Sequence, residues 1–345
     1  MRLAAGMLCL IAISGCSIVD VAHEGEAIAA LAVQRTVLLQ ADDRDAPLFQ
    51  VAVLPGGELL VVGAQRAVSF SAAGQRLRET IVGDGPHYPL RYVWWGETGT
   101  DGRTEPGFVG VARDGRSVGV YAADGQVARR LHVPALPNIT IANVTGDATP
   151  ELVIQHDVGE GVEVFDRTGQ SLGRVEAPGY VTDFDVLPGP SDEARGLVFY
   201  LYPVGEGGRF VITGLDGTVR QQWDDRPLGA FALLSWQGRT ALVSAPDEAY
   251  RVVAPGGEVL GSFAARTVRR VGRILSCELA GGRRVFVSSS RGGPQEHTVS
   301  IFDAGGRLVY HDRSDEDVQD LQPLPDRNGF YLVTRRRLAR FTVSG

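Results

Sequence analysis

The sequence predicts an all-β fold, a β-propeller of seven four-stranded blades closed into a ring. Three observations lead to this prediction. A hairpin signature ending in glycine recurs along the chain, four strand-like runs fit into each repeat, and the two chain ends supply complementary parts of one blade. The composition agrees, because 44 of the 345 residues are glycine, nearly twice the usual share of about 7%. Turn-rich β structure accounts for such an excess.

Each repeat starts with alternating apolar and polar residues, passes through a short turn and ends in a second alternation. "SVGVYAADGQVARRL" and "TVSIFDAGGRLVYHD" are two of the six copies. Glycine at the turn supplies the positive φ that a tight hairpin or bulge requires, and period-two alternation buries one face of each strand. The turn glycines lie 40 to 51 residues apart, at Gly74, Gly125, Gly169, Gly217, Gly257 and Gly306.

Two further strand-like runs lie between successive hairpins. In the third repeat they are residues 138–144 and 151–156, and in the fourth they are residues 181–187 and 196–202. Four strands in about 46 residues is the period of a propeller blade. The unequal spacing favours propeller loops over a tightly repeating solenoid.

The chain ends predict how the ring closes. The last repeat stops after "LARFTVSG" and lacks a fourth strand, whereas residues 33–40, "VQRTVLLQ", resemble a fourth strand without a hairpin partner. Pairing of residues 33–40 with residues 337–343 closes the ring and leaves no free sheet edge there. This gives seven blades; six or eight stay open if a degenerate blade is miscounted.

The first residues are predicted to form an export signal. Arg2 supplies the positive charge, and Leu3 to Ile13 is an apolar segment of signal length that is too short to span a bilayer. The signal ends Ile13-Ser14-Gly15-Cys16. The chain therefore divides into a signal at residues 1–15, a tether at residues 16–32 with room for one or two helical turns, and a propeller at residues 33–345.

The segment Ile13-Ser14-Gly15-Cys16 resembles the lipobox of bacterial lipoproteins. The resemblance implies that the signal is removed before Cys16, that its sulfur receives a diacylglycerol group, and that the new amine is acylated, for example with palmitate. Several acyl chains anchor a protein stably where one alone is marginal. Ser17, in place of the aspartate that favours the inner membrane, points to the periplasmic face of the outer membrane. The alternative is an ordinary secretory signal with a coincidental cysteine.

Composition excludes several classes of function. The net charge is −7 and Arg335–Arg337 is the only basic run, so nucleic-acid binding is not expected. The chain has no lysine, which excludes Schiff-base and Walker-type lysine chemistry. Cys277 is the only cysteine after Cys16, so no internal disulfide forms, and it is expected to be a core residue of a strand.

Two loops contain oxygen-bearing residues at matching positions. One has Asn143, Thr145, Asp147 and Glu151, and the other has Glu97, Asp101 and Glu105. They resemble the acidic loops of FG-GAP propeller repeats. The resemblance implies a structural calcium ion held by carboxylate and carbonyl oxygens. The match is partial, because Asn143 replaces the first acid and Ala148 the turn glycine. The alternative is a metal-free turn capped by the aspartate. No other cofactor is expected.

Residues 83–97 combine a connection between blades with a cluster of aromatic side chains. His87, Tyr88, Tyr92 and Trp95 are the candidate binding residues, because aromatics at connecting loops suit a recognition surface. The alternative is that Trp94 and Trp95 alternate between two layers of packing between blades.

No catalytic motif is visible: there is no HExxH, no Gly-x-Ser-x-Gly, no CxxC and no phosphate-binding glycine loop. The first hypothesis is therefore a non-enzymatic, membrane-anchored lipoprotein that binds or scaffolds another envelope protein. The alternatives are a hydrolase or lyase, or a carbohydrate-binding propeller. An enzyme requires histidines and acids that converge at the ring centre, and the candidates are His87, His132, His156, His297, Asp183, Asp185 and Asp320.

Overall fold

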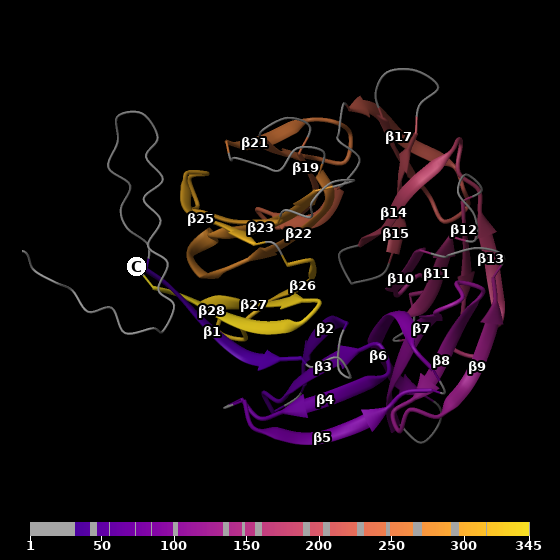
Figure 1. The fold of residues 1–345 in the computed structure, drawn as a ribbon. Coiled ribbons are helices and arrows are strands. Elements are labelled where there is room, and N and C mark those ends of the chain that lie inside the picture. Colours follow the sequence, from indigo (N-terminus) through magenta and orange to yellow (C-terminus); the bar gives the residue numbers. More distant parts are fainter. Residues whose placement is uncertain are drawn as a thin grey trace, which may run out of the picture.

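Seven four-stranded antiparallel sheets are arranged around one axis in the computed structural model (Figure 1). The prediction of an all-β, seven-bladed propeller is confirmed. The only helical element of the described chain is a 3-10 turn at Ala280–Gly282, and no helix in that part is long and apolar enough to cross a membrane. The structure describes residues 32–41, 47–54, 56–72, 74–83, 85–98, 103–133, 138–146, 149–155, 161–188, 194–202, 208–225, 231–245, 249–264, 271–290, 297–314 and 316–344.

In blades 1 to 6 the four strands follow one another along the chain from the axis outwards, whereas the outermost strand of blade 7 is β1. Blade 1 consists of β2 (Leu48–Val53), β3 (Leu59–Gly63), β4 (Arg66–Phe70) and β5 (Arg76–Ile81). Blade 2 consists of β6 (His87–Thr98), β7 (Arg103–Ala112), β8 (Ser117–Ala122) and β9 (Val127–His132). Blade 3 consists of β10 (Asn138–Ala142), β11 (Glu151–Gln155), β12 (Val162–Phe165) and β13 (Ser171–Val175). Blade 4 consists of β14 (Val181–Pro188), β15 (Ala194–Leu201), β16 (Gly208–Thr213) and β17 (Val219–Asp225). Blade 5 consists of β18 (Phe231–Trp236), β19 (Arg239–Ser244), β20 (Ala249–Val253) and β21 (Val259–Ala264). Blade 6 consists of β22 (Val271–Glu278), β23 (Arg284–Ser290), β24 (His297–Phe302) and β25 (Leu308–Ser314). Blade 7 consists of β26 (Val318–Pro323), β27 (Gly329–Thr334), β28 (Arg337–Ser344) and β1 (Ala32–Gln40).

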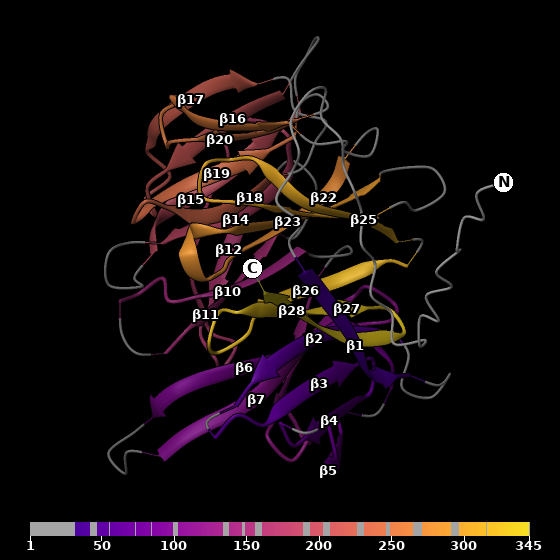
Figure 2. The ribbon, with the colours of Figure 1, turned by 90° about the vertical axis from the view of Figure 1, so that its left-hand side faces the viewer.

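The predicted ring closure is confirmed. Strand β1 pairs antiparallel with β28, with Val33 opposite Val343 and Gln40 opposite Arg337, and one register shift between Val37 and Leu39. Strand β1 lies beside β28 in both views of the molecule (Figures 1 and 2). The first strand of the described chain thus completes the last blade.

The six glycine hairpins share one geometry. In each, the glycine amide donates to the carbonyl three residues earlier, for example Gly125 to Ala122 at 2.9 Å. A register shift precedes each turn, as expected for a turn combined with a bulge. Gly125 has a φ of 84°, and a Cβ there would overlap the carbonyl oxygen of Ile81 in blade 1. Glycine is therefore required both for the turn and for the approach of the two blades.

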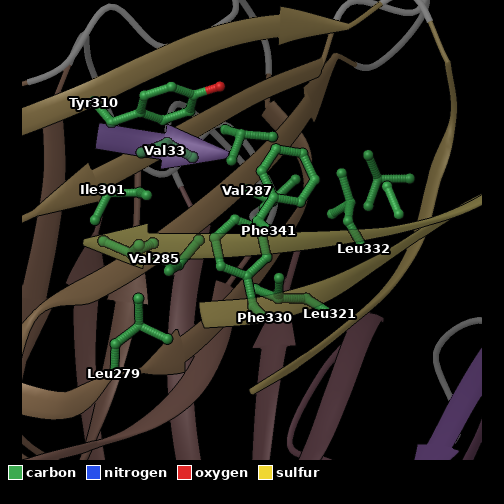
Figure 3. Packing of buried hydrophobic residues seen from close by; sticks show 14 residues of the cluster. Val33, Leu279, Val285, Val287, Ile301, Tyr310, Leu321, Phe330, Leu332 and Phe341 are labelled. Atoms are coloured by element: carbon green, nitrogen blue, oxygen red, sulfur yellow. The ribbon is translucent and has the colours of Figure 1, made fainter. Parts of the chain in front are cut away.

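The hydrophobic core lies between neighbouring blades rather than inside any single sheet. The cluster between blades 6 and 7 contains Val285 and Ile301 from blade 6 and Phe330 and Phe341 from blade 7 (Figure 3). Val33 of β1 is 4% exposed and belongs to the same cluster. Each blade is therefore stable only with its neighbours, which explains why the ring must close.

Antiparallel order gives the ring two different faces. The connections between blades and between second and third strands lie at one end of the strands, which we call the connector face. The glycine hairpins and the connections between first and second strands lie at the other end, which we call the hairpin face. Since β28 runs towards the hairpin face and Ala32 pairs with Ser344, the described chain begins at the hairpin face.

Candidate functional site on the inner strands

A repeated irregularity places polar residues at the connector end of the inner strands. In four blades a register shift follows the first residue of the inner strand, and the next paired residue is polar. A bulge at such a position redirects a side chain. The apolar residue that comes directly afterwards is buried in each case, whereas the polar one is only partly buried. These polar residues are Gln50, Asp183, Arg273 and Asp320.

Blade 2 contributes Arg91 in a similar way, after a register shift between His87 and Leu90. Its guanidinium donates from an Nη atom to the carbonyl oxygen of Phe49 in blade 1, at 2.8 Å. Gln50 of blade 1 in turn accepts a hydrogen bond from the backbone amide of Tyr92, at 2.7 Å. Side chains of the inner strands therefore bond blades 1 and 2 reciprocally.

Asp320 connects blade 7 to the same group. Its carboxylate accepts hydrogen bonds from the amide of Val51 in blade 1, at 3.0 Å, and from that of Leu321, at 2.9 Å. Burial lowers the pKa of Arg91, and the charge of Asp320 opposes that shift. Burial raises the pKa of Asp320, and Arg91 opposes that shift in the same way. The two groups are thus electrostatic partners across three blades.

Asp185, on the inner strand of blade 4, has no such partner among the residues that the structure describes. Burial raises its pKa from 3.8 to about 6, and the only opposing influence is a hydrogen bond from the amide of Val186, at 2.8 Å. The ionised carboxylate is therefore poorly compensated in the folded protein at neutral pH.

Replacing Asp185 by asparagine is expected to stabilise the protein above pH 6. The raised pKa means that ionisation costs folding free energy as the pH rises from 3.8 to 6, and above pH 6 the full cost is present. Asparagine keeps the hydrogen-bond acceptor and removes the charge, which corresponds to a gain of about 1–3 kcal/mol at pH 7.5. Urea unfolding of the wild type and of Asp185→Asn, at pH 7.5 and near pH 4, measures this gain in the free energy of unfolding. The idea fails if the gain is equally large at both pH values.

His297 is fully buried in blade 6, and neither ring nitrogen has a hydrogen bond. Its Nε2 lies 3.7 Å from Asp317. Burial lowers the pKa of His297, Asp317 opposes this, and the charge of Arg273 adds to the lowering. The imidazole is therefore neutral at neutral pH.

Of the histidines and acids that an enzyme would require, His87, His297 and Asp320 have separate partners. His87 is buried beside the Tyr121 hydroxyl at 3.1 Å. His297 lies near Asp317, Asp320 faces Arg91, and His132 is exposed on the outer strand β9. His156 lies outside the described residues. Within the described ranges, no three His, Cys, Asp or Glu side chains are close enough to hold a metal ion.

The predicted aromatic binding residues are not all at the surface. His87 and Trp95 are buried, at 3% and 4% exposure, and Tyr92 is partly buried against Phe108. Tyr88 is 47% exposed and its ring packs edge-on against Phe49. Of the four tryptophans only Trp94, at 43%, is exposed. Trp95 is buried as the packing alternative expects, whereas Trp94 is exposed and does not form the second packing layer. The four tryptophans do not form a series of exposed side chains for carbohydrate.

The predicted acidic loop of blade 3 is held by its own hydrogen bonds. Glu151 is 3% exposed and accepts from the amides of Val144, at 2.6 Å, and Thr145, at 3.2 Å, and from the Thr145 hydroxyl at 2.7 Å. Asn143 accepts from the amide of Gly146. Both carboxylate oxygens of Glu151 thus serve the turn, which favours the metal-free alternative. Of the other predicted ligands, Glu97 belongs to β6 and Glu105 to β7, while Asp101 and Asp147, like the lipidation residue Cys16, lie outside the described residues.

Calcium is accordingly expected to leave the stability of the protein unchanged. The melting temperature should be the same in EDTA and in calcium chloride. Glu151→Gln should lower the free energy of unfolding by about 1–2 kcal/mol in both buffers, because it weakens charge-assisted hydrogen bonds in a buried turn. A rise in melting temperature with calcium that Glu151→Gln abolishes would instead establish a metal site.

Sequence reasoning missed the roles of Gln50, Arg91, Arg273 and Asp320 in one inner-strand group. A signal exists: an apolar residue, any residue and then a polar residue begin the inner strands at 48–50, 181–183, 271–273 and 318–320. The pattern is short, and it becomes visible only when the inner strands are aligned.

Comparison with known proteins defines the fold alone. No protein-family model and no curated protein sequence matches this chain. Among solved structures, it is similar to virginiamycin B lyase from Staphylococcus aureus, with a TM-score of 0.60 and 12% identity over 90% of this chain and 99% of the lyase. It is also similar to BBS1N in complex with ARL6DN, with a TM-score of 0.57 and 13% identity over 90% and 95%. The WD40 domain of Neurospora crassa Pan2 matches with a TM-score of 0.54 and 12% identity over 89% and 95%.

Proposed function

We propose that this chain is a lipid-anchored protein of the bacterial envelope whose propeller binds another protein without catalysing a reaction. The observation that carries the proposal is the bonding of the inner strands. Gln50, Arg91 and Asp320 bind backbone groups of neighbouring blades, so the polar groups at the ring centre hold the blades together. A ring locked in this way provides a rigid platform with loops on both faces.

The similar structures are compatible with binding and do not decide the function. One of them is a propeller in complex with a protein, ARL6DN, and another is a lyase. Since one fold hosts unrelated functions, the proposal rests on the residues of this chain.

The anchor is tested by the residue that the lipobox resemblance assigns. Cys16→Ser in the full chain is expected to move the protein from the membrane fraction to the soluble fraction. Cys277→Ser is the matched control and should remain with the membrane, since Cys277 is a partly buried strand residue whose pKa burial raises to about 12. Separation of the inner and outer membranes tests the expectation, from Ser17, of the outer one. Equal distribution of both variants would contradict the anchor.

Partner binding is tested by cross-linking in intact envelopes, followed by capture of the lipidated protein and identification of the cross-linked chain. The expected result is one envelope protein that is recovered with the wild type and with Cys277→Ser. Absence of any cross-linked protein, together with turnover of a small substrate by the purified propeller, would overturn the proposal.

A further inference from the structure

The direction of β1 shows at which face of the ring the proposed tether joins the propeller. Ala32 pairs with Ser344, so the chain enters β1 at the hairpin face. Residues 16–31 separate the proposed lipid attachment at Cys16 from β1, and they span at most about 55 Å when fully extended. The shortest arrangement therefore turns the hairpin face towards the membrane and the connector face away from it.

The exposed tyrosines of the chain are all on the connector face. Of the nine tyrosines, only Tyr88, Tyr180 and Tyr202 are exposed, at 47%, 54% and 63%. Tyr88 lies at the start of β6, Tyr180 just before β14 and Tyr202 just after β15. The amide of Tyr202 donates to the carbonyl of Tyr180 at 2.8 Å, which places the two blade 4 connections side by side. Tyrosine gives a large, rigid contact with a polar end and is enriched at protein interfaces.

Arg273 adds a positive charge at the connector end of the ring centre. Its guanidinium acts electrostatically on Arg91 and on His297, lowering the pKa of both. Asp320 compensates Arg91, whereas Arg273 has no hydrogen bond or ion pair among the residues that the structure describes. Asp183 and Asp185 belong to blade 4, two blades away. An uncompensated, partly buried guanidinium favours a carboxylate from outside the chain.

We propose that the connector face is the docking surface for the partner protein, with Tyr88, Tyr180 and Tyr202 packing against its surface and Arg273 receiving one of its carboxylates. This inference rests on the proposed function and adds the face and the chemistry of the contact. The partner is an envelope protein with an acidic segment, because Arg273 brings an uncompensated positive charge to the connector end of the ring centre, where the partner docks.

Hydroxyl-radical footprinting of the lipidated protein tests the face. Three samples are compared: intact envelopes, vesicles of phosphatidylethanolamine and phosphatidylglycerol, and the purified protein in detergent. Oxidation of Tyr180 and Tyr202 should fall about fivefold in envelopes only. Leu172 and Val259 are similarly exposed, at 46% and 56%, near the hairpin face, and serve as internal controls.

Each outcome is decisive. Protection of Leu172 and Val259 instead of the tyrosines would refute the face while leaving partner binding intact. Equal protection of the tyrosines in lipid vesicles would mean contact with the membrane rather than with a protein. No protection anywhere in envelopes would refute the proposed function as well.

Variants test the contact chemistry. Tyr180→Ala combined with Tyr202→Ala, and separately Arg273→Gln, should each reduce the cross-linked partner at least fivefold, with unchanged unfolding midpoints. Leu172→Ala, an exposed change at the opposite face, should have no effect. A cross-linking yield that is unaffected by both sets of changes would refute the proposal.

Discussion

Replacing Val33 by aspartate is expected to lower the free energy of unfolding by at least about 4 kcal/mol, the largest effect that we predict for a single residue. Val33 is 4% exposed and belongs to a cluster with Tyr310, Phe341 and Val287 from blades 6 and 7 (Figure 3). An aspartate there must either bury an unpaired charge or pull β1 away from β28. The second outcome would open the ring.

Gln34→Asp is the matched control. Gln34 is the next residue of β1, it is exposed, and it lies opposite Thr342 in the same pairing. The substitution introduces the same charge into the same strand but on its exposed side. The free energy of unfolding is therefore expected to change by no more than about 0.5 kcal/mol. Urea unfolding followed by circular dichroism measures both variants. Equal unfolding midpoints would show that β1 contributes little to closure.

Val33→Ala separates packing from charge. Loss of two methyl groups from a tightly packed site should cost about 1–2.5 kcal/mol, between the control and Val33→Asp. Opening the ring also leaves β28 as an unpaired edge. We therefore expect Val33→Asp, and not Val33→Ala, to form aggregates at high protein concentration, which light scattering detects.

The sequence was sufficient for the architecture because the repeat is local. Each turn glycine, such as Gly125, and the alternation around it specify one hairpin, and six hairpins at similar spacing specify a ring. Closure could be predicted because the missing strand of the last blade and the spare strand at residues 33–40 are both visible in the sequence.

The candidate site could not be predicted to the same extent, because it depends on contacts between blades that are far apart in the chain. Asp320 bonds to the amide of Val51, 269 residues away, and nothing near Asp320 in the sequence indicates this. Periodicity also failed to show which residue of a bulged strand is exposed. Tyr88 and Trp94 are exposed in β6, while their neighbours His87 and Trp95 are buried.

Asp320→Ala is expected to lower the free energy of unfolding by about 2–4 kcal/mol. The substitution leaves the amide of Val51 without its acceptor and removes the charge that compensates Arg91 at the ring centre. Asp320→Asn keeps an acceptor oxygen and should cost less, about 1–2 kcal/mol. The difference between the two variants isolates the hydrogen bonds from the charge.

A double-mutant cycle with Arg91→Met determines whether the two charges act as a pair. Arg91→Met alone loses the bond to the Phe49 carbonyl and leaves Asp320 uncompensated. In the double variant neither charge is left alone, so its cost should be smaller than the summed costs of the single variants by about 1–2 kcal/mol. Additive costs would mean that the two residues stabilise blades 1, 2 and 7 independently. Coupling would instead show that one electrostatic pair spans the junction where the first and last blades meet, which makes ring closure depend on the inner strands as well as on β1.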